Sequence, residues 1–150
     1  MVDVVSNYEN KNIKFELSIA DDDCVILADR NRLSQAILNI ISNAEKFVSD
    51  NETISIAISK KKNSSDLNGN IVVVRIKDNG SGIDSEILDK LFTKFTTKSF
   101  QGTGLGLYIT KSIIEAHGGH IWAENNNGEK GATFSFSLPI DFYKSNEKNN

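Results

Sequence analysis

The chain has 150 residues, of which 17 are Lys or Arg and 20 are Asp or Glu, giving a formal net charge of −3 at pH 7. This length fits a single domain that can bury a core of its own. Positive and negative charges are interspersed along the chain. They therefore exclude the basic face that a nucleic-acid-binding domain needs.

The compartment is indicated by three features. The single cysteine, Cys24, fits a reducing environment, and beside apolar neighbours it is interpreted as a small buried residue. The sequence has neither an N-terminal signal pattern nor an apolar run near the ~20 residues that cross a bilayer. We therefore expect a cytoplasmic domain that makes no direct membrane contact, although its parent protein could be anchored in a membrane.

The N-terminal part of the chain predicts two strands and a long helix. Residues 1–12 are polar and are interpreted as the remnant of a linker or helix. Apolar and polar residues alternate over 13–19, which predicts a half-buried strand, and 25–27 is a short apolar strand. Asp29 can then cap a helix over about 30–48, in which apolar residues recur at helical spacing.

The rest of the chain alternates short strands with two further helices. A strand at 54–58 is followed by a polar loop over 60–70 that contains the basic run 60–62. The β-branched run 71–76 predicts a strand that is buried on both faces. The remaining elements, in chain order, are a short helix at 85–91, a long helix at 104–117 followed by left-handed Gly118, and strands at 121–124 and 132–138.

These elements predict an α+β fold. The chain contains one proline, and no breaker-rich linker divides it, so residues 13–140 are expected to form one domain, followed by a disordered tail at 141–150. The element order predicts two layers: a mixed, mostly antiparallel sheet covered on one face by about three helices.

Asn39, Asn43 and Lys46 lie on one face of the first long helix, since residues three and four apart share a face. An Asn carbonyl is a hard oxygen ligand for Mg²⁺, and Lys is a point charge for phosphate. The three side chains therefore suit a hydrated cation and phosphates. The alternative is that the two amides simply face solvent.

An acidic residue and a glycine-rich turn, Asp78-Asn-Gly80-Ser-Gly82, follow the buried strand. This order places one carboxylate at the floor of a pocket, where it can accept a hydrogen bond from an exocyclic amine such as that of adenine. Gly80 and Gly82 would let the backbone approach a flat ring closely. The alternative is an ordinary turn capped by Asp78.

Two further segments complete the pattern. Phe92 and Phe95 can anchor a loop while Lys98 faces a phosphate, although aromatic residues at this spacing are often simply core. The glycine-rich segment 102–107 opens the second long helix, and unpaired N–H groups at a helix start form an anion site. It is neither a dinucleotide fingerprint, which needs Gly where Leu107 stands, nor a P-loop, which needs Gly-Lys-Ser/Thr.

In order, the four segments resemble the asparagine box, the first glycine box, the phenylalanine box and the second glycine box of histidine kinase catalytic domains. The resemblance covers residues 13–139 and extends to the larger group that contains DNA gyrase, MutL repair proteins and heat-shock chaperones. It implies the Bergerat ATP-binding fold and a two-component histidine protein kinase, with ATP and Mg²⁺ as cofactors.

The resemblance also implies a role for each residue. Asn43 would hold Mg²⁺ against the triphosphate, with Asn39 and Lys46 nearby, and Asp78 would accept from the adenine amine. Lys98, on a short lid between 95 and 102, would face the γ-phosphate. The other nucleotide-binding residues would be Gly80, Gly82 and Ile83 beside the base, Thr133 in support of Asp78, and Gly102, Thr103, Gly104, Leu105, Gly106 and Leu107 beside the phosphates.

Asn39 and Lys98 are the residues assigned to catalysis. In gyrase-like ATPases, the position that matches Asn39 holds a Glu that activates water as a general base. Asn cannot take that proton at neutral pH, so the site would not hydrolyse ATP by this route.

Neither histidine fits the phosphoacceptor that the resemblance implies, because neither is followed by an acid. His117 is interpreted as a helix C-terminal residue and His120 as the start of a strand. We therefore expect two partners: a histidine-bearing dimerisation domain, in cis or in trans, and a downstream response regulator. Two alternatives stay open, a stand-alone anti-sigma-type serine kinase and a non-catalytic nucleotide-sensing module of the same fold.

Overall fold

A computed structural model describes residues 11–20, 24–62, 69–96 and 103–140. The predicted N-terminal remnant, apart from its last two residues, and the predicted tail lie outside these ranges. Within them the strands are β1 (Lys14–Ile19), β2 (Thr53–Lys62), β3 (Asn70–Asp78), β4 (His120–Asn125) and β5 (Ala132–Pro139). The helices are α1 (Arg30–Phe47), α2 (Ser85–Leu88) and α3 (Gly106–Ala116).

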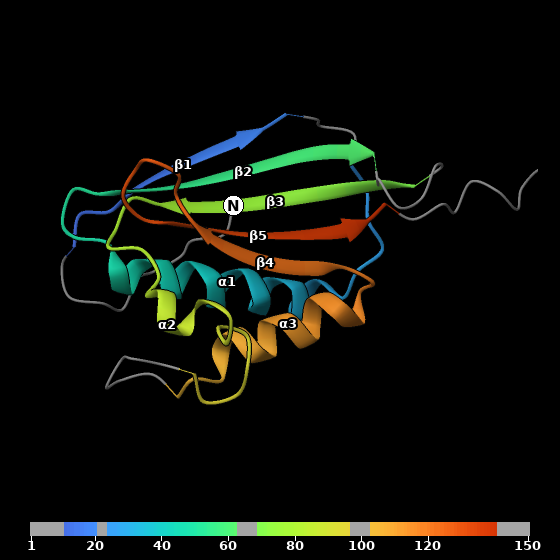
Figure 1. Ribbon diagram of the computed structural model, residues 1–150. Helices are drawn as coiled ribbons and strands as arrows, with labels where there is room; N and C mark the ends of the chain where they lie inside the picture. The colour runs from blue at the N-terminus through green and yellow to red at the C-terminus, as the bar shows by residue number, and fades with distance from the viewer. Residues whose placement is uncertain (1–10, 21–23, 63–68, 97–102, 141–150) are drawn as a thin grey trace, which may run out of the picture.

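The strands form one sheet in the order β1-β2-β3-β5-β4, and the helices lie together on one side of it (Figure 1). β1 pairs with β2 in parallel, and the other three pairs of neighbouring strands are antiparallel. The predicted α+β class and the mixed, mostly antiparallel sheet under a single helical layer are therefore confirmed.

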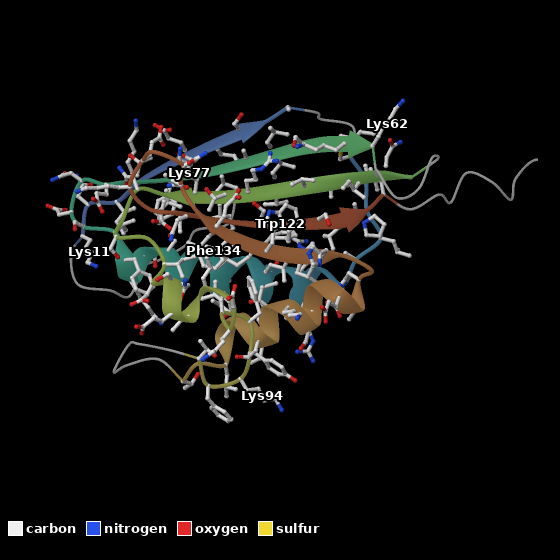
Figure 2. All side chains as sticks on the ribbon, viewed as in Figure 1. Lys11, Lys62, Lys77, Lys94, Trp122 and Phe134 are labelled. Atoms are coloured by element: carbon white, nitrogen blue, oxygen red, sulfur yellow. The ribbon has the colours of Figure 1, made fainter. Side chains whose placement is uncertain are left out.

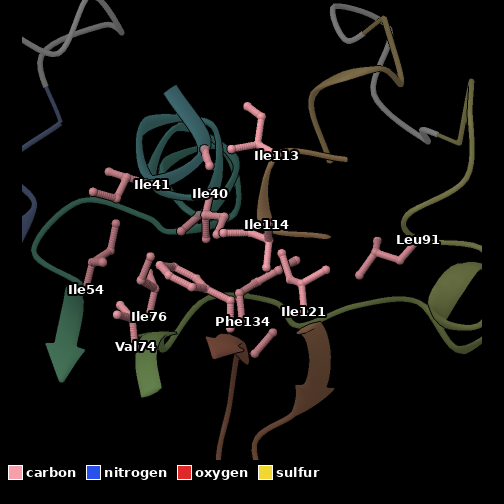
Figure 3. Packing of buried hydrophobic residues seen from close by; sticks show 14 of the residues in the cluster. Ile40, Ile41, Ile54, Val74, Ile76, Leu91, Ile113, Ile114, Ile121 and Phe134 are labelled. Carbon is pink, nitrogen blue, oxygen red and sulfur yellow. The ribbon is translucent and has the colours of Figure 1, made fainter. Parts of the chain in front are cut away.

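The core fills the space between the helices and the sheet. Ile40 of α1 and Ile114 of α3 are fully buried and meet Ile76 and Phe134 of the sheet (Figure 3). Truncation of a buried Phe to Ala typically costs about 3–5 kcal/mol of stability. Phe134 also reaches the wall of a cavity described below, so the core directly supports that cavity.

The start of α1 is tied to the end of α3. Asp29 is the N-cap of α1, and its side chain accepts a hydrogen bond from Arg32 N at 3.0 Å. His117 follows α3; its Nε2 accepts from Asp29 N–H at 3.0 Å, and its Nδ1 lies 2.7 Å from Ile113 O. Since Nε2 accepts in this arrangement, Nδ1 is the ring nitrogen placed to donate to Ile113 O. Gly118 follows with φ 74°, which confirms the predicted end of α3. The Asp29 contact confirms the predicted cap of α1.

The prediction of a half-buried first strand was wrong. β1 forms, but all its residues are exposed, and Leu17 retains 66% of its accessible surface. The reason is its place in the sheet: β1 is an edge strand, whereas α1 packs over the sheet's interior (Figure 1). Alternation along a sequence distinguishes the two faces of a strand, but it does not show whether a second layer covers either face.

Other boundaries also differ from the prediction. Residues 25–27 form no strand; Val25 is 82% exposed, and Cys24 is half-buried instead of buried. The basic run 60–62 belongs to β2 and not to a loop, because it continues the pairing with β3 up to Lys62 opposite Asn70 (Figure 2). The short helix α2 ends three residues earlier than expected, at Leu88.

Candidate functional site

Asp78 ends β3 and lies at the floor of a cavity with only 3% of its surface exposed. Its Oδ1 accepts hydrogen bonds from Gly80 N at 3.0 Å and from Ala132 N at 3.3 Å. Burial raises the pKa of Asp78, and the two N–H donors act in the opposite direction. Among the described residues no group donates to Oδ2, so this oxygen can accept from a ligand.

The cavity above Asp78 has a volume of about 380 Å³. Its walls are mostly apolar, and Asp78 is the buried carboxylate among them. The wall consists of Asn43, Phe47, Asp78, residues 81–84, Ile87, Leu91, Thr96, Leu107, Ala132 and Phe134. An apolar hollow with one convergent acceptor suits a flat ring that carries an amino group.

The two glycines of the turn have different tasks. Gly82 lines the cavity and has a left-handed backbone, with φ 82°. Gly80 does not line the cavity: a Cβ there would lie 2.3 Å from Phe47 O at the end of α1. The prediction that Gly80 touches the base is therefore not supported, and its absent side chain instead lets the turn pack against α1.

A second, polar hollow of about 150 Å³ adjoins the first, with which it shares Asn43, Thr96 and Leu107. It also contains Asn39, Ser42 and Lys46 from α1 and Thr103, Gly104 and Gly106 from the start of α3. The predicted helix face and the predicted glycine-rich segment thus meet across one hollow. Unpaired N–H groups at the start of α3 add a preference for anions.

Asn39 and Asn43 differ in their contacts. Asn39 Nδ2 donates to Gly106 O at 3.3 Å, so Asn39 ties α1 to the first residue of α3. Thr110 Oγ1 donates to the same oxygen at 2.9 Å. The side chain of Asn43 has no hydrogen bond within the described part of the chain, so its amide oxygen is available to a cation. The described residues contain no cluster of His, Cys, Asp and Glu that could hold a metal alone, so phosphate oxygens and water would complete the ligand set.

The two phenylalanines do not act as a pair. Phe92 packs edge-on against Phe134, with 6.5 Å between ring centroids, whereas Phe95 is 73% exposed and left-handed, with φ 61°. Phe95 N donates to Gly104 O at 2.9 Å, which holds the loop beside the glycine-rich segment. Only Phe92 is therefore the anchor that the sequence predicted. Lys98 and Gly102 lie outside the described residues.

Thr133 supports Asp78 by an indirect route. Its hydroxyl donates to Asn126 Oδ1 at 2.7 Å, and Asn126 Nδ2 donates to Asp78 O at 2.8 Å. Ile83, as predicted, lines the cavity. Leu105 is the N-cap of α3, and its N–H lies 3.4 Å from Thr103 Oγ1.

Several wall residues escaped the sequence prediction. Ser42 lies one helical step from both Asn39 and Lys46, so the helical spacing could have identified it. Ile87 and Leu91 are four residues apart within the predicted helix 85–91, so the same spacing could have identified them, although α2 itself ends at Leu88. Thr96, which contributes to both hollows, lies in an irregular stretch that gives no periodic signal.

The fold and the two adjoining hollows define a nucleotide-binding domain of the ATPase type. The sequence profile of the histidine kinase-, DNA gyrase B- and HSP90-like ATPases matches residues 28–141, and the chain belongs to this family. Its relatives within that family are sensor histidine kinases. It is 40% identical over 135 residues to sensor protein KdpD of Clostridium acetobutylicum and 31% identical over 145 residues to sensor histidine kinase WalK of Bacillus subtilis.

The solved catalytic domain of histidine kinase ThkA superposes with a TM-score of 0.72 at 35% identity, covering 86% of this chain and 81% of that domain. The match covers 86% of this chain but 14% of KdpD, and 93% of this chain but 23% of WalK. The domain is thus an ATP-binding catalytic domain of the sensor-kinase type. None of the described helices combines the length and the apolarity that a bilayer crossing requires.

Proposed function

We propose that this domain binds Mg-ATP and transfers the γ-phosphate to a histidine on a dimerisation domain, in the same longer protein or on a separate chain. The observation that supports this most directly is the pair of adjoining hollows. One is apolar with a single buried carboxylate, and the other is polar and lies at the start of a helix.

The apolar hollow suits adenine. Asp78 Oδ2 would accept a hydrogen bond from the 6-amino group, because Oδ1 is already used by two backbone N–H groups. Ile83, Leu107 and other apolar wall residues would cover the faces of the ring. A buried acceptor that is left unpaired is costly, so the site would discriminate against purines without an amino group at this position.

The polar hollow suits the triphosphate. Lys46 and the start of α3 supply positive potential, and Asn43 would hold Mg²⁺ through its amide oxygen. Mg²⁺ bound there would neutralise charge on the β- and γ-phosphates. Lys98, the residue predicted to face the γ-phosphate, and the lid between 95 and 102 remain predictions.

The side chains that line the polar hollow favour a kinase over a hydrolase. Its described lining residues are amides, hydroxyls, one ammonium, glycines and a leucine, with no carboxylate or imidazole to take a proton from water. Phosphoryl transfer depends chiefly on positioning and electrostatics. The γ-phosphorus bond to the bridging oxygen would break, a bond to the acceptor histidine nitrogen would form, and ADP would leave.

The expected downstream partner is a response regulator aspartate, which would receive the phosphoryl group from the histidine. Histidine kinase ThkA has been solved in complex with the response regulator TrrA, and this chain matches that kinase at 33% identity with a TM-score of 0.68. The match covers 35% of that kinase chain. The likeness supports the same kind of partner for the parent of this domain.

Calorimetry with Mg-ATP tests the proposal. We expect saturable heat that returns to a flat baseline, since the site would hold ATP for another acceptor. Continuing heat after each injection would indicate hydrolysis and would contradict the kinase assignment. A folded sample that gives no heat would overturn the nucleotide site itself. Transfer of label from γ-labelled ATP to a separately supplied histidine-bearing dimerisation domain would then test the acceptor.

A further inference from the structure

The hairpin between β4 and β5 is hydrogen-bonded to the turn 78–83, which contributes to the cavity wall. Asn125, the last residue of β4, accepts a hydrogen bond from Ile83 N at its Oδ1 (2.7 Å) and donates from Nδ2 to Ile83 O (2.9 Å). One side-chain amide thus pairs with both backbone groups of a residue far away in the sequence. The Gly82 Cβ position lies 2.9 Å from Asn125 Oδ1, so this amide fits tightly only over glycine.

Asn126 is hydrogen-bonded to the other end of the same turn, at Asp78. Its Nδ2 donates to Asp78 O and to Lys130 O, both at 2.8 Å, and its Oδ1 accepts from Thr133 Oγ1. Its backbone N–H donates to Gly131 O at 2.9 Å. Asn126 therefore joins the carbonyl of Asp78 to three points of the hairpin.

Neither asparagine is part of the cavity wall, but the two residues that they hold are. Asp78 carries the free Oδ2, and Ile83 forms part of the apolar wall beside it. The spacing between this acceptor and this wall determines whether a flat ring can lie against one while it reaches the other. In the turn between them, Gly82 has left-handed φ, a flexible residue whose conformation the flanking contacts must fix.

We infer that Asn125 is a positioning residue for the nucleotide base. It fixes Ile83 at the distance from Asp78 that lets adenine contact both residues, and Asn126 holds the end of the turn that carries Asp78. The inference rests on the proposed nucleotide function. It also explains why an amide is needed. A side-chain amide presents an acceptor and a donor on the same carbon, and these pair with Ile83 N–H and C=O.

Two substitutions separate positioning from folding. Asn125→Asp keeps the acceptor for Ile83 N–H but places a carboxylate oxygen against Ile83 O, which repels it. Asn125→Ala removes both bonds. Asn127→Ala is the matched control, because Asn127 lies in the same hairpin, is exposed and has no side-chain hydrogen bond within the described ranges. Asn125 is also exposed, so neither substitution at this position should unfold the domain.

The readout compares two probes on the same protein. Mg-ATP needs both hollows, whereas Mg-tripolyphosphate needs only the polar hollow. We expect Asn125→Asp and Asn125→Ala to weaken Mg-ATP about tenfold, equivalent to about 1.4 kcal/mol, and to leave Mg-tripolyphosphate unchanged. Exchange of the Ile83 amide hydrogen should become faster in both variants and stay unchanged in Asn127→Ala.

Two results would overturn the inference. If the wild-type chain binds Mg-ATP and Asn125→Ala binds it equally well, Asn125 does not position the base, and the proposed function survives. Equal weakening of both probes would also overturn it, since that indicates a general loss of structure. A wild-type chain that fails to bind Mg-ATP would instead remove the proposed function, and the positioning role would fall with it.

Discussion

Replacing Asp78 with asparagine should reverse the purine preference of the site, because the two side chains differ only in the group that faces the cavity. Asp78 Oδ1 accepts from Gly80 N and Ala132 N, and an asparagine oxygen can accept from the same donors. The amide nitrogen then takes the place of Oδ2 and donates instead of accepting. Opposite the 6-amino group of adenine, two donors would face each other.

The size of the effect follows from the bond that is lost. A hydrogen bond to a charged group contributes about 1.5–3 kcal/mol, so Asp78→Asn should weaken Mg-ATP binding about 10- to 150-fold. Inosine triphosphate carries an oxygen acceptor at the same ring position. The variant should therefore bind it more tightly than the wild type does.

Calorimetry of both nucleotides with wild type and variant checks this prediction. Asp50→Asn, an exposed substitution outside the cavity wall, is the control for handling and folding. If Asp78→Asn weakens ATP and inosine triphosphate equally, then Asp78 supports the fold without reading the base. That result would refute the reasoning from Oδ2.

Protonation of the same carboxylate should affect Mg-ATP affinity and folding stability in opposite directions. Burial raises the pKa of Asp78, so it takes up a proton at a higher pH than an exposed Asp does. On acidification, Mg-ATP affinity should fall in that raised range, since the protonated group loses its acceptor, whereas Asp78→Asn should show no such step. Folding stability behaves in the opposite way, because a raised native pKa stabilises at low pH and this contribution is lost as pH rises through the raised value.

Three further substitutions test other parts of the site and core. Asn43→Ala should remove the Mg²⁺ dependence of ATP affinity in calorimetry with and without the ion, while Ser34→Ala on an exposed part of α1 should retain it. Glu45 is 5% exposed with an unpaired Oε1, and burial raises its pKa. Glu45→Met should therefore raise the free energy of unfolding by about 1 kcal/mol at neutral pH and by less in acid. A lower free energy of unfolding for this variant, measured by urea unfolding, would contradict this. Gly80→Ala places Cβ 2.3 Å from a backbone oxygen of α1 and should cost about 3 kcal/mol, whereas Gly106→Ala, with no atom within 4 Å of its Cβ, should not destabilise.

Much of the fold and part of the site could be predicted from local sequence. The helical spacing of Asn39, Asn43 and Lys46 was sufficient to place them on one face, and all three line the polar hollow. Asp78 was predicted at the floor of a pocket because it follows a buried strand and precedes a glycine-rich turn, with an ordinary turn capped by Asp78 as the alternative. In the structure Asp78 lines the cavity and also accepts from Gly80 N within the turn. The first prediction needed only helical spacing, and the second needed only the order of residues along the chain.

What could not be predicted depends on contacts between distant segments. Asn125 and Asn126 lie in a turn-rich stretch whose composition gives no sign that their amides reach Ile83 and Asp78. The exposure of β1 depends on how much of the sheet α1 covers. For Gly80, the sequence predicted close approach of the backbone, but the partner is the end of α1 instead of a ring.

Asn39 would contribute to the proposed mechanism in two ways, by its lack of a basic group and by its contact with α3. A carboxylate at this position could serve as a base for water, but it could not donate to Gly106 O and would repel that carbonyl. In the proposed kinase the amide would therefore leave the polar hollow without a hydrolytic base, and the same contact ties α1 to Gly106, the first residue of α3, which lines this hollow. Under the proposed function the site would hold ATP until a separate acceptor arrives, and it would then need both properties: no group that activates water, and a phosphate-binding segment held in place before the acceptor docks.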